Sequence, residues 1–141
     1  MEVLKSACDV AARYGVYLNF EPTNRFEINF INTTDEGLDI IRRVDKPNLG
    51  LLLDLYHIYL EDPDVMDSIW KARHVVRHFH FSDSDRWPAG LGHGAFDFRA
   101  LVGLLKTIGY RGFLAEGLVP TDNVDEAART TAAFLRRVIA E

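Results

Sequence analysis

A fourfold alternation of short apolar runs with longer amphipathic segments is the pattern that most constrains how this chain can fold. The apolar runs predict strands at 16–21, 50–54, 75–81 and 112–116. Helices are predicted at 2–14, from 33 to the turn before Pro47, from 62 through Trp70, at 96–108 and at 123–140. Because parallel neighbours need helical crossovers, this alternation predicts an α/β fold with parallel strands, right-handed connections and outer helices.

Local signals mark where these elements begin and end. Gly15 is placed to stop the first helix, and Pro22 closes the first strand. Thr33 and Glu36 have the spacing of a capping box, in which each side chain satisfies a backbone N–H at the start of a helix. The predicted boundaries therefore rest on residues of known capping chemistry as well as on apolar periodicity.

Composition limits the classes of protein to which the chain can belong. It has 141 residues, 48% hydrophobic and 26% charged, which is enough for one packed domain over 1–141. A net charge of -5 without a basic stripe argues against a nucleic-acid partner. No apolar run approaches the ~20 residues of a membrane span, and the single cysteine, Cys8, leaves no internal disulfide. The expected location is cytoplasmic, with no membrane partner.

Each predicted strand ends close to an acidic or imidazole side chain. These four residues are Glu21, Asp54, His80 and Glu116. The carboxyl edge of a parallel sheet is where ligands bind, and carboxylates with one imidazole suit Mn²⁺, Mg²⁺ or Co²⁺. Taken singly, each residue has a plainer explanation: a surface-facing strand end for either glutamate, a helix or loop cap for the aspartate, a hydrogen-bonded core histidine for the imidazole.

Four motifs, LNFEPTNRFE, LLLDLYH, HFHFSDSDR and FLAEG, resemble those of the xylose isomerase-like TIM barrels, most closely the tagatose/psicose 3-epimerase branch. The resemblance implies a (βα)4 half of a (β/α)8 barrel. It implies a divalent metal, with Mn²⁺ favoured over Co²⁺ or Mg²⁺, held by Glu21, Asp54, His80 and Glu116. It further implies substrate contacts from Glu27, His57 and Arg86.

The activity implied by this resemblance is that of a metal-dependent sugar isomerase or epimerase. A proton would be removed from C3 of a ketose and returned to the opposite face through an enediolate, with Glu21 and Glu116 as acid and base. The alternatives left open are aldose–ketose isomerisation, an inosose-dehydratase-like or hydroxypyruvate-isomerase-like enzyme, and a non-catalytic half-barrel that serves as an assembly module. The DNA-repair endonucleases of the superfamily use more histidines, and the acidic balance argues against them.

The length of the chain raises a further question. A TIM barrel needs eight strands and about 250 residues, whereas four strands are predicted here and the motifs match the carboxyl-terminal half. The expected explanations are a truncated chain, a half-barrel that pairs with a second copy as a dimer, or a chain that needs a separate amino-terminal half. Whether the chain is active alone is left open by the sequence.

Overall fold

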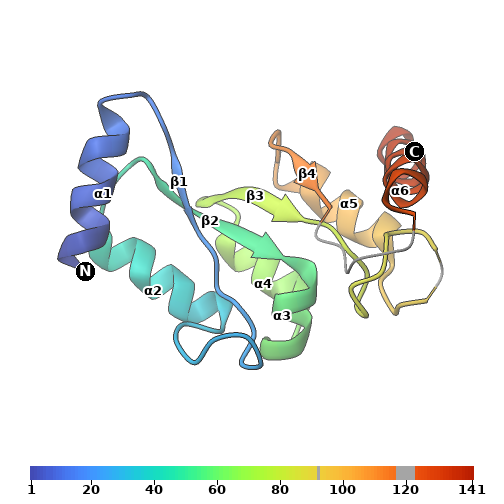
Figure 1. The fold of residues 1–141 in the computed structure, drawn as a ribbon, viewed down its shortest axis with the longest axis horizontal. Coiled ribbons are helices and arrows are strands. Elements are labelled where there is room, and N and C mark those ends of the chain that lie inside the picture. Colours follow the sequence, from blue (N-terminus) through green and yellow to red (C-terminus); the bar gives the residue numbers. More distant parts are fainter. Residues whose placement is uncertain (92, 117–122) are drawn as a thin grey trace.

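The computed structural model describes residues 1–91, 93–116 and 123–141 of the chain. Within these residues a single sheet has the order β1-β2-β3-β4, and every neighbouring pair is parallel (Figure 1). The strands are β1 (Leu18–Phe20), β2 (Leu49–Asp54), β3 (Val76–His80) and β4 (Leu114–Ala115). The predicted parallel sheet, with strands in chain order, is confirmed.

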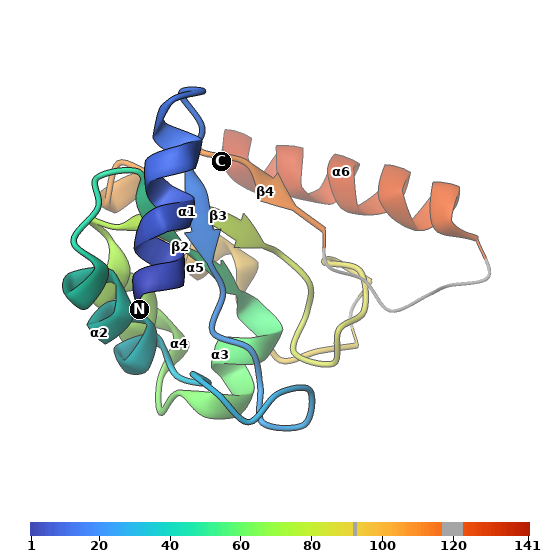
Figure 2. The same ribbon diagram turned by 60° about the vertical axis from the view of Figure 1, so that its left-hand side comes forward.

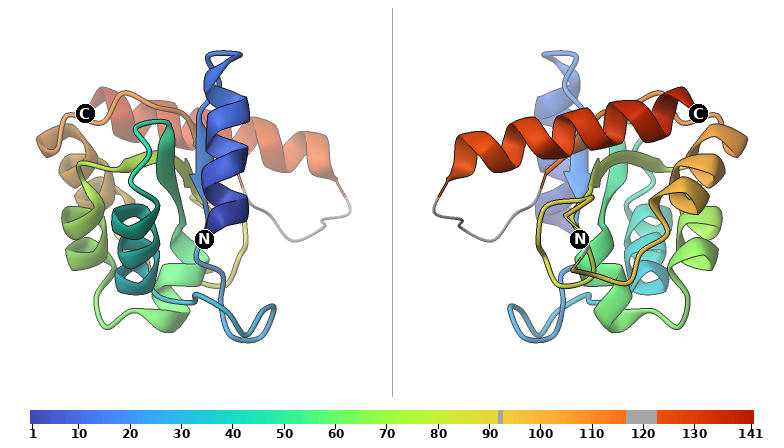
Figure 3. Two further views of the ribbon diagram at one scale, coloured as in Figure 1. Left: turned by 90° about the vertical axis from the view of Figure 1, so that its left-hand side faces the viewer. Right: turned by 90° about the vertical axis from the view of Figure 1, so that its right-hand side faces the viewer.

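Helices connect the strands. They are α1 (Glu2–Ala12), α2 (Thr34–Val44), α3 (Leu55–Glu61), α4 (Val65–Ala72), α5 (Phe98–Thr107) and α6 (Val124–Ala140). Helices α2, α4 and α5 lie on the same side of the sheet, while α1 lies beside the β1 edge and α6 toward the β4 end (Figures 1 and 3). This is the predicted (βα)4 arrangement with outer helices, half of a TIM barrel. In the part of the chain that is described, no helix is both long and apolar enough to cross a membrane.

The core lies between the sheet and its helices. Leu51, Leu53 and Phe79 are fully buried and belong to a cluster that extends to residues of α4, α5 and α6. A smaller cluster joins α1 to α2 and β2, with Cys8 at its centre. Burial of these side chains anchors β2 and β3 most firmly, and these two strands bear two of the four candidate ligands.

The capping box at the start of α2 is confirmed. The backbone N–H of Glu36 donates to Thr33 Oγ1 at 3.2 Å, and the backbone N–H of Thr33 donates to Glu36 Oε2 at 3.0 Å. The helix ends at Val44 because Asp45 turns into the left-handed region, with φ of 51°. Local chemistry therefore sets both ends of this helix: the start is as the sequence predicts, and the end comes at Asp45, before the Pro47 that was expected to end it.

Helix α3 was not predicted, and the helix expected to begin at Asp62 begins later. Strand β2 runs directly into α3, because Asp54 is both its last residue and the N-cap, with Oδ1 accepting from the N–H of Tyr56 at 2.9 Å. Asp64 caps α4, whereas the Asp62 carboxylate accepts the N–H of Thr34 at 3.1 Å. The plainer interpretation of Asp54 as a cap is therefore true of one of its oxygens.

Candidate functional site

The carboxyl ends of the strands gather the candidate residues at one edge of the sheet. Glu21 directly follows β1, Asp54 ends β2 and His80 ends β3. The loop after β1 and helix α3 after β2 lie side by side at this edge (Figure 2). Three of the four predicted metal ligands thus come from adjacent parallel strands, and Asp54 and His80 are partners in the strand register.

Glu21, Asp54 and His80 form a compact charged group. His80 Nδ1 lies 3.6 Å from Glu21 Oε1 and 3.4 Å from Asp54 Oδ2. The negative charge of Asp54 and then that of Glu21 raise the pKa of His80 to about 9, against the opposing effect of burial. Burial acts to raise the pKa of Asp54, but its neighbours, His80 first and then His57, Tyr56 N–H and Arg86, hold it below its usual value.

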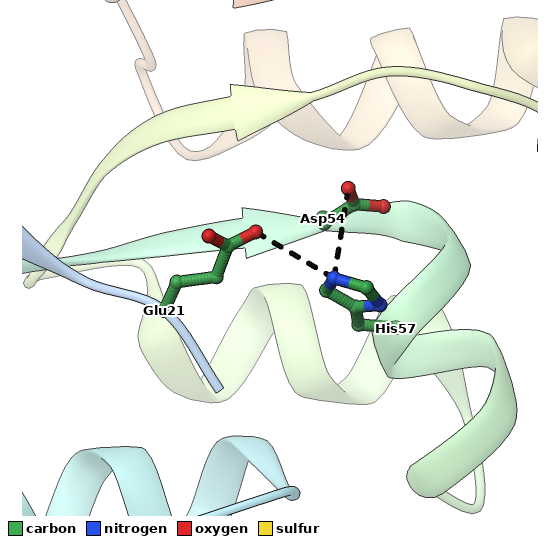
Figure 4. A group of neighbouring side chains, drawn as sticks. All are labelled: Glu21, Asp54 and His57. Atoms are coloured by element: carbon green, nitrogen blue, oxygen red, sulfur yellow. Dashed lines mark ion pairs between the residues drawn. The ribbon is translucent and has the colours of Figure 1, made fainter. Parts of the chain in front are cut away.

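His57 joins the same group from the first turn of α3. Its Nε2 lies 3.7 Å from Glu21 Oε1 and 4.0 Å from Asp54 Oδ2. Figure 4 marks both pairs with dashed lines. Glu21, Asp54 and His57 each offer an atom within 4.8 Å of the others, a geometry that could hold a cation. The sequence motifs predict His57 as a substrate contact rather than a metal ligand, so two histidines compete here for the role of ligand.

One oxygen of Asp54 identifies the kind of partner that the site requires. The side chain is fully buried, and its Oδ2 has no hydrogen-bond partner among the described residues. The nearest cationic groups are His80 Nδ1 at 3.4 Å and Arg86 Nη2 at 3.5 Å, and both lie beyond good hydrogen-bonding distance. A buried carboxylate oxygen without a donor is costly, and a divalent cation would satisfy it. The residues therefore fit a metal ion.

Glu116 is placed differently from the other three candidates. It follows β4, and its Oε1 accepts from the N–H of Ala89 at 3.4 Å, while Oε2 is buried without a partner among the described residues. Burial is the main reason that the pKa of Glu116 rises to about 7. It is not in the group of atoms within 4.8 Å that Glu21, Asp54 and His57 form, and neither is His80, which instead pairs with both carboxylates. The structure thus leaves this predicted ligand beside the cluster rather than in it.

Glu27 and Arg86, two of the predicted substrate contacts, lie against each other. Arg86 Nη1 donates to Glu27 Oε1 at 2.6 Å, and the guanidinium covers the ring of Tyr56 at 4.9 Å. Arg86 also has a φ of 66°, a left-handed conformation that costs energy for a residue other than glycine. Such strain is typical of functional loops. The pair borders the Asp54 carboxylate through Arg86 Nη2.

Asn24 is the site residue that the sequence analysis missed. It is 1% exposed, and its Nδ2 lies 2.9 Å from Glu27 Oε1 and 2.8 Å from His57 Nδ1. It therefore links two predicted substrate contacts. The available signal was an asparagine between the two glutamates of EPTNRFE, but neither its burial nor its contact with His57 can be read from spacing.

Comparison with known proteins identifies the family of the chain. Residues 1–138 match the family described as xylose isomerase-like TIM barrel. The chain is 33% identical over 138 residues to an L-ribulose 3-epimerase of Mesorhizobium japonicum, covering 98% of this chain and 46% of that protein. It is 29% identical over 160 residues to a D-psicose 3-epimerase of Agrobacterium fabrum, covering 99% of this chain and 55% of that protein.

A solved structure gives the same result in three dimensions. The apo form of a 3-keto-D-glucoside 4-epimerase from Escherichia coli superimposes with a TM-score of 0.87 at 29% identity, covering 96% of this chain and 51% of that one. The chain spans about half the length of the curated relatives it matches. The similar enzymes act at two different sugar carbons, C3 and C4, by their names.

Proposed function

Since the chain belongs to the xylose isomerase-like TIM barrel family, we propose that it is the metal-binding half of an epimerase that inverts C3 of a ketose. The observation that carries this proposal is the buried Asp54 Oδ2, which has no donor among the described residues and faces Glu21 and His80 at the carboxyl edge of the sheet. Two relatives are named as 3-epimerases of the ketoses L-ribulose and D-psicose, and these names favour C3 over C4.

Glu21, Asp54 and His80 would hold the cation, with Glu116 as the fourth ligand. Oxygen and imidazole donors without a thiolate favour Mn²⁺, with Co²⁺ and Mg²⁺ as alternatives. When bound, the cation would supply Lewis-acid stabilisation of negative charge on the sugar oxygens. For Glu116 to reach the group, its carboxylate must leave the N–H of Ala89, a contact of 3.4 Å that is weak for a hydrogen bond.

Proton transfer is proposed for Glu21 and Glu116, which follow strands at the two edges of the sheet and so could face opposite sides of a bound sugar. Without a cation, burial raises the pKa of Glu116 to about 7, and a cation held by the same carboxylate would lower it from there. Glu27, His57 and Arg86 would bind and orient the sugar hydroxyls. A planar guanidinium held by Glu27 is well suited to neighbouring hydroxyl oxygens.

Completion of the barrel is part of this proposal. Strands β1 and β4 each pair on one side only within the described residues, and large apolar side chains are exposed beside them: Tyr17 at 57% and Phe113 at 81%. An amino-terminal half, or a second copy of this chain, would cover both edges. Light scattering after size exclusion distinguishes the two. A particle of twice 16.0 kDa indicates a second copy, and a monomer indicates a separate half.

The proposed chemistry is tested on whichever assembly is found. D-psicose or L-ribulose is incubated in D₂O with Mn²⁺, and NMR follows both inversion and deuterium incorporation at C3. We expect Glu21→Gln or Glu116→Gln to lower the rate by about 100- to 10,000-fold, the usual contribution of general acid–base catalysis. The control is Glu2→Gln on α1, where the side chain is 89% exposed.

The product identifies the reaction. Exchange at C3 with inversion supports the proposal. A keto product that has lost water would assign a dehydratase instead, an aldose would assign an isomerase, and exchange at C4 would place the chain with the 4-epimerases. Tight Mn²⁺ binding without any exchange, in a complete barrel, would contradict a catalytic role.

A further inference from the structure

Asn24 contacts three polar groups from a position with almost no solvent exposure. Its Oδ1 accepts from the backbone N–H of Phe26 at 3.0 Å. Its Nδ2 lies 2.9 Å from Glu27 Oε1 and 2.8 Å from His57 Nδ1. All three distances are those of good hydrogen bonds, so every hydrogen-bonding direction of this amide except one oxygen lone pair is used.

Two neighbours independently determine which way the amide points. A backbone N–H can only donate, so the Asn24 atom that faces Phe26 must be the oxygen. The Glu27 carboxylate, paired with Arg86, can only accept, so the atom that faces it must be the nitrogen. Turning the amide over would bring oxygen to carboxylate and nitrogen to N–H, two repulsive contacts in a buried place. The positions of the oxygen and the nitrogen of the Asn24 amide are therefore determined by which neighbour donates and which accepts.

The orientation of Asn24 has a direct consequence for His57. One hydrogen of Nδ2 goes to Glu27, and the other points at His57 Nδ1, which must accept it. An imidazole nitrogen that accepts carries no proton, so the ring proton lies on Nε2. We propose that Asn24 is a positioning residue that holds His57 as the Nε2–H tautomer, so that His57 donates a hydrogen bond into the site and does not bind the cation.

This assignment separates the two histidines that compete for the metal. A ligating imidazole must present a lone pair. His57 turns its Nε2–H toward Glu21 Oε1 and Asp54 Oδ2 at 3.7 and 4.0 Å, and it keeps that proton as long as Asn24 donates to its Nδ1. Among the described residues no such donor fixes the protons of His80, which can therefore release the proton of Nδ1 and present a lone pair where that atom faces the same two carboxylates. Both His57 distances exceed a normal hydrogen bond, so Nε2–H is free to donate to a ligand oxygen. That this oxygen belongs to a ketose rests on the proposed function; the position of the proton does not.

The test determines by NMR which ring nitrogen of His57 carries the proton. The full chain is labelled with ¹⁵N in its histidine rings, and long-range ¹H–¹⁵N spectra distinguish the two neutral tautomers. Spectra are taken with chelator and then with Mg²⁺, in the absence of sugar, and the His57 signals are assigned by their loss in His57→Gln. We expect the Nε2–H pattern in both conditions. Asn24→Asp places an acceptor beside Nδ1 and is expected to move a proton onto that nitrogen.

Asn32→Ala is the matched control. Asn32 lies in the same loop, and its Nδ2 donates to the carbonyls of Thr23 and Ile28 at 2.5 and 3.1 Å, without touching His57. This variant should leave the His57 pattern unchanged. The inference fails if the wild type shows Nδ1–H, if Asn24→Asp retains the Nε2–H pattern, or if Asn32→Ala alters the pattern as Asn24→Asp does.

Metal affinity gives a second readout that does not depend on the loop variants. His57→Gln is expected to leave the Mn²⁺ dissociation constant within error of the wild type, whereas His80→Gln should raise it by about 100-fold or more, beyond the usual effect of an outer-sphere partner. Equal weakening by the two variants would make His57 a ligand and overturn the inference. Because no sugar enters either measurement, failure of the proposed epimerase activity would leave this result untouched.

Discussion

Binding of Mn²⁺ to this chain is expected to release about one proton at pH 7.5. The source is His80, whose pKa is raised to about 9 by the carboxylates of Asp54 and Glu21 in the metal-free protein. At about 1.5 pH units below that pKa the ring is protonated in a ratio of roughly 30 to 1. A cation that takes the His80 lone pair must displace this proton.

The sign of the pH dependence follows from the same pKa. Below about 9 the proton competes with the cation, so the apparent affinity should rise about tenfold for each pH unit from 6.5 to 8.5 and level off above 9. An unperturbed histidine, with a pKa of about 6.5, would instead release little at pH 7.5 and show a nearly flat affinity above pH 7. The two cases differ by about one proton per site.

Calorimetry in buffers of different ionisation enthalpy measures the released protons directly. His80→Gln should abolish most of the release. His74→Gln, which replaces an exposed histidine in the turn before β3, should leave it unchanged. A release near zero in the wild type, or an affinity independent of pH between 6.5 and 8.5, would refute the assignment of His80 as the protonated group that faces the two carboxylates.

Further expectations concern stability without metal. Because the pKa of His80 is raised from its unfolded value of 6.5 to about 9, its stabilising effect is complete below pH 6.5 and is lost as the pH rises through about 9; the melting temperature should fall over that range and recover with Mn²⁺. Burial of Glu116 raises its pKa to about 7 from 4.5, so its charged form opposes folding above neutral pH; Glu116→Gln should raise the melting temperature at pH 8 but not at pH 4.5. Thr33→Ala removes the capping box of α2 and should lower the free energy of unfolding, measured in urea, by about 1 kcal/mol; an unchanged value would contradict the cap. Phe79→Ala empties a fully buried site and should cost about 3 to 5 kcal/mol, and a cost below that of the cap variant would contradict the packing described for β3.

The elements that could be predicted are those whose signals lie within a few residues. The alternation of apolar runs and amphipathic segments gave the parallel sheet, and the capping box at Thr33 gave the start of α2. Helix α3 was missed because its seven residues follow the strand without a break, and its cap is the same Asp54 that was read as a ligand. A side chain with two oxygens can serve both purposes, one oxygen each, and only the tertiary structure shows which oxygen caps the helix and which faces the site.

The lengths of the two edge strands could not be predicted from neighbouring residues alone. Strands predicted at 16–21 and 112–116 contain three and two paired residues in the structure. A strand is defined by its partner, and each edge strand has a partner on one side only within the described residues. The same limit applies to Glu116, whose position beside the cluster depends on the short β4 and on its contact with Ala89.

The sequence by itself determined the fold class, the family and the four acidic or imidazole side chains at strand ends, because periodicity, capping and strand direction depend on residues that are close together in the chain. The tertiary structure alone decided which groups meet. Asn24 reaches His57 across 33 positions, and Glu27 reaches Arg86 across 59. Hydrogen bonds between residues so far apart depend on how the sheet brings its loops together, and it is these bonds that distinguish a histidine that donates a proton from one that can bind a metal.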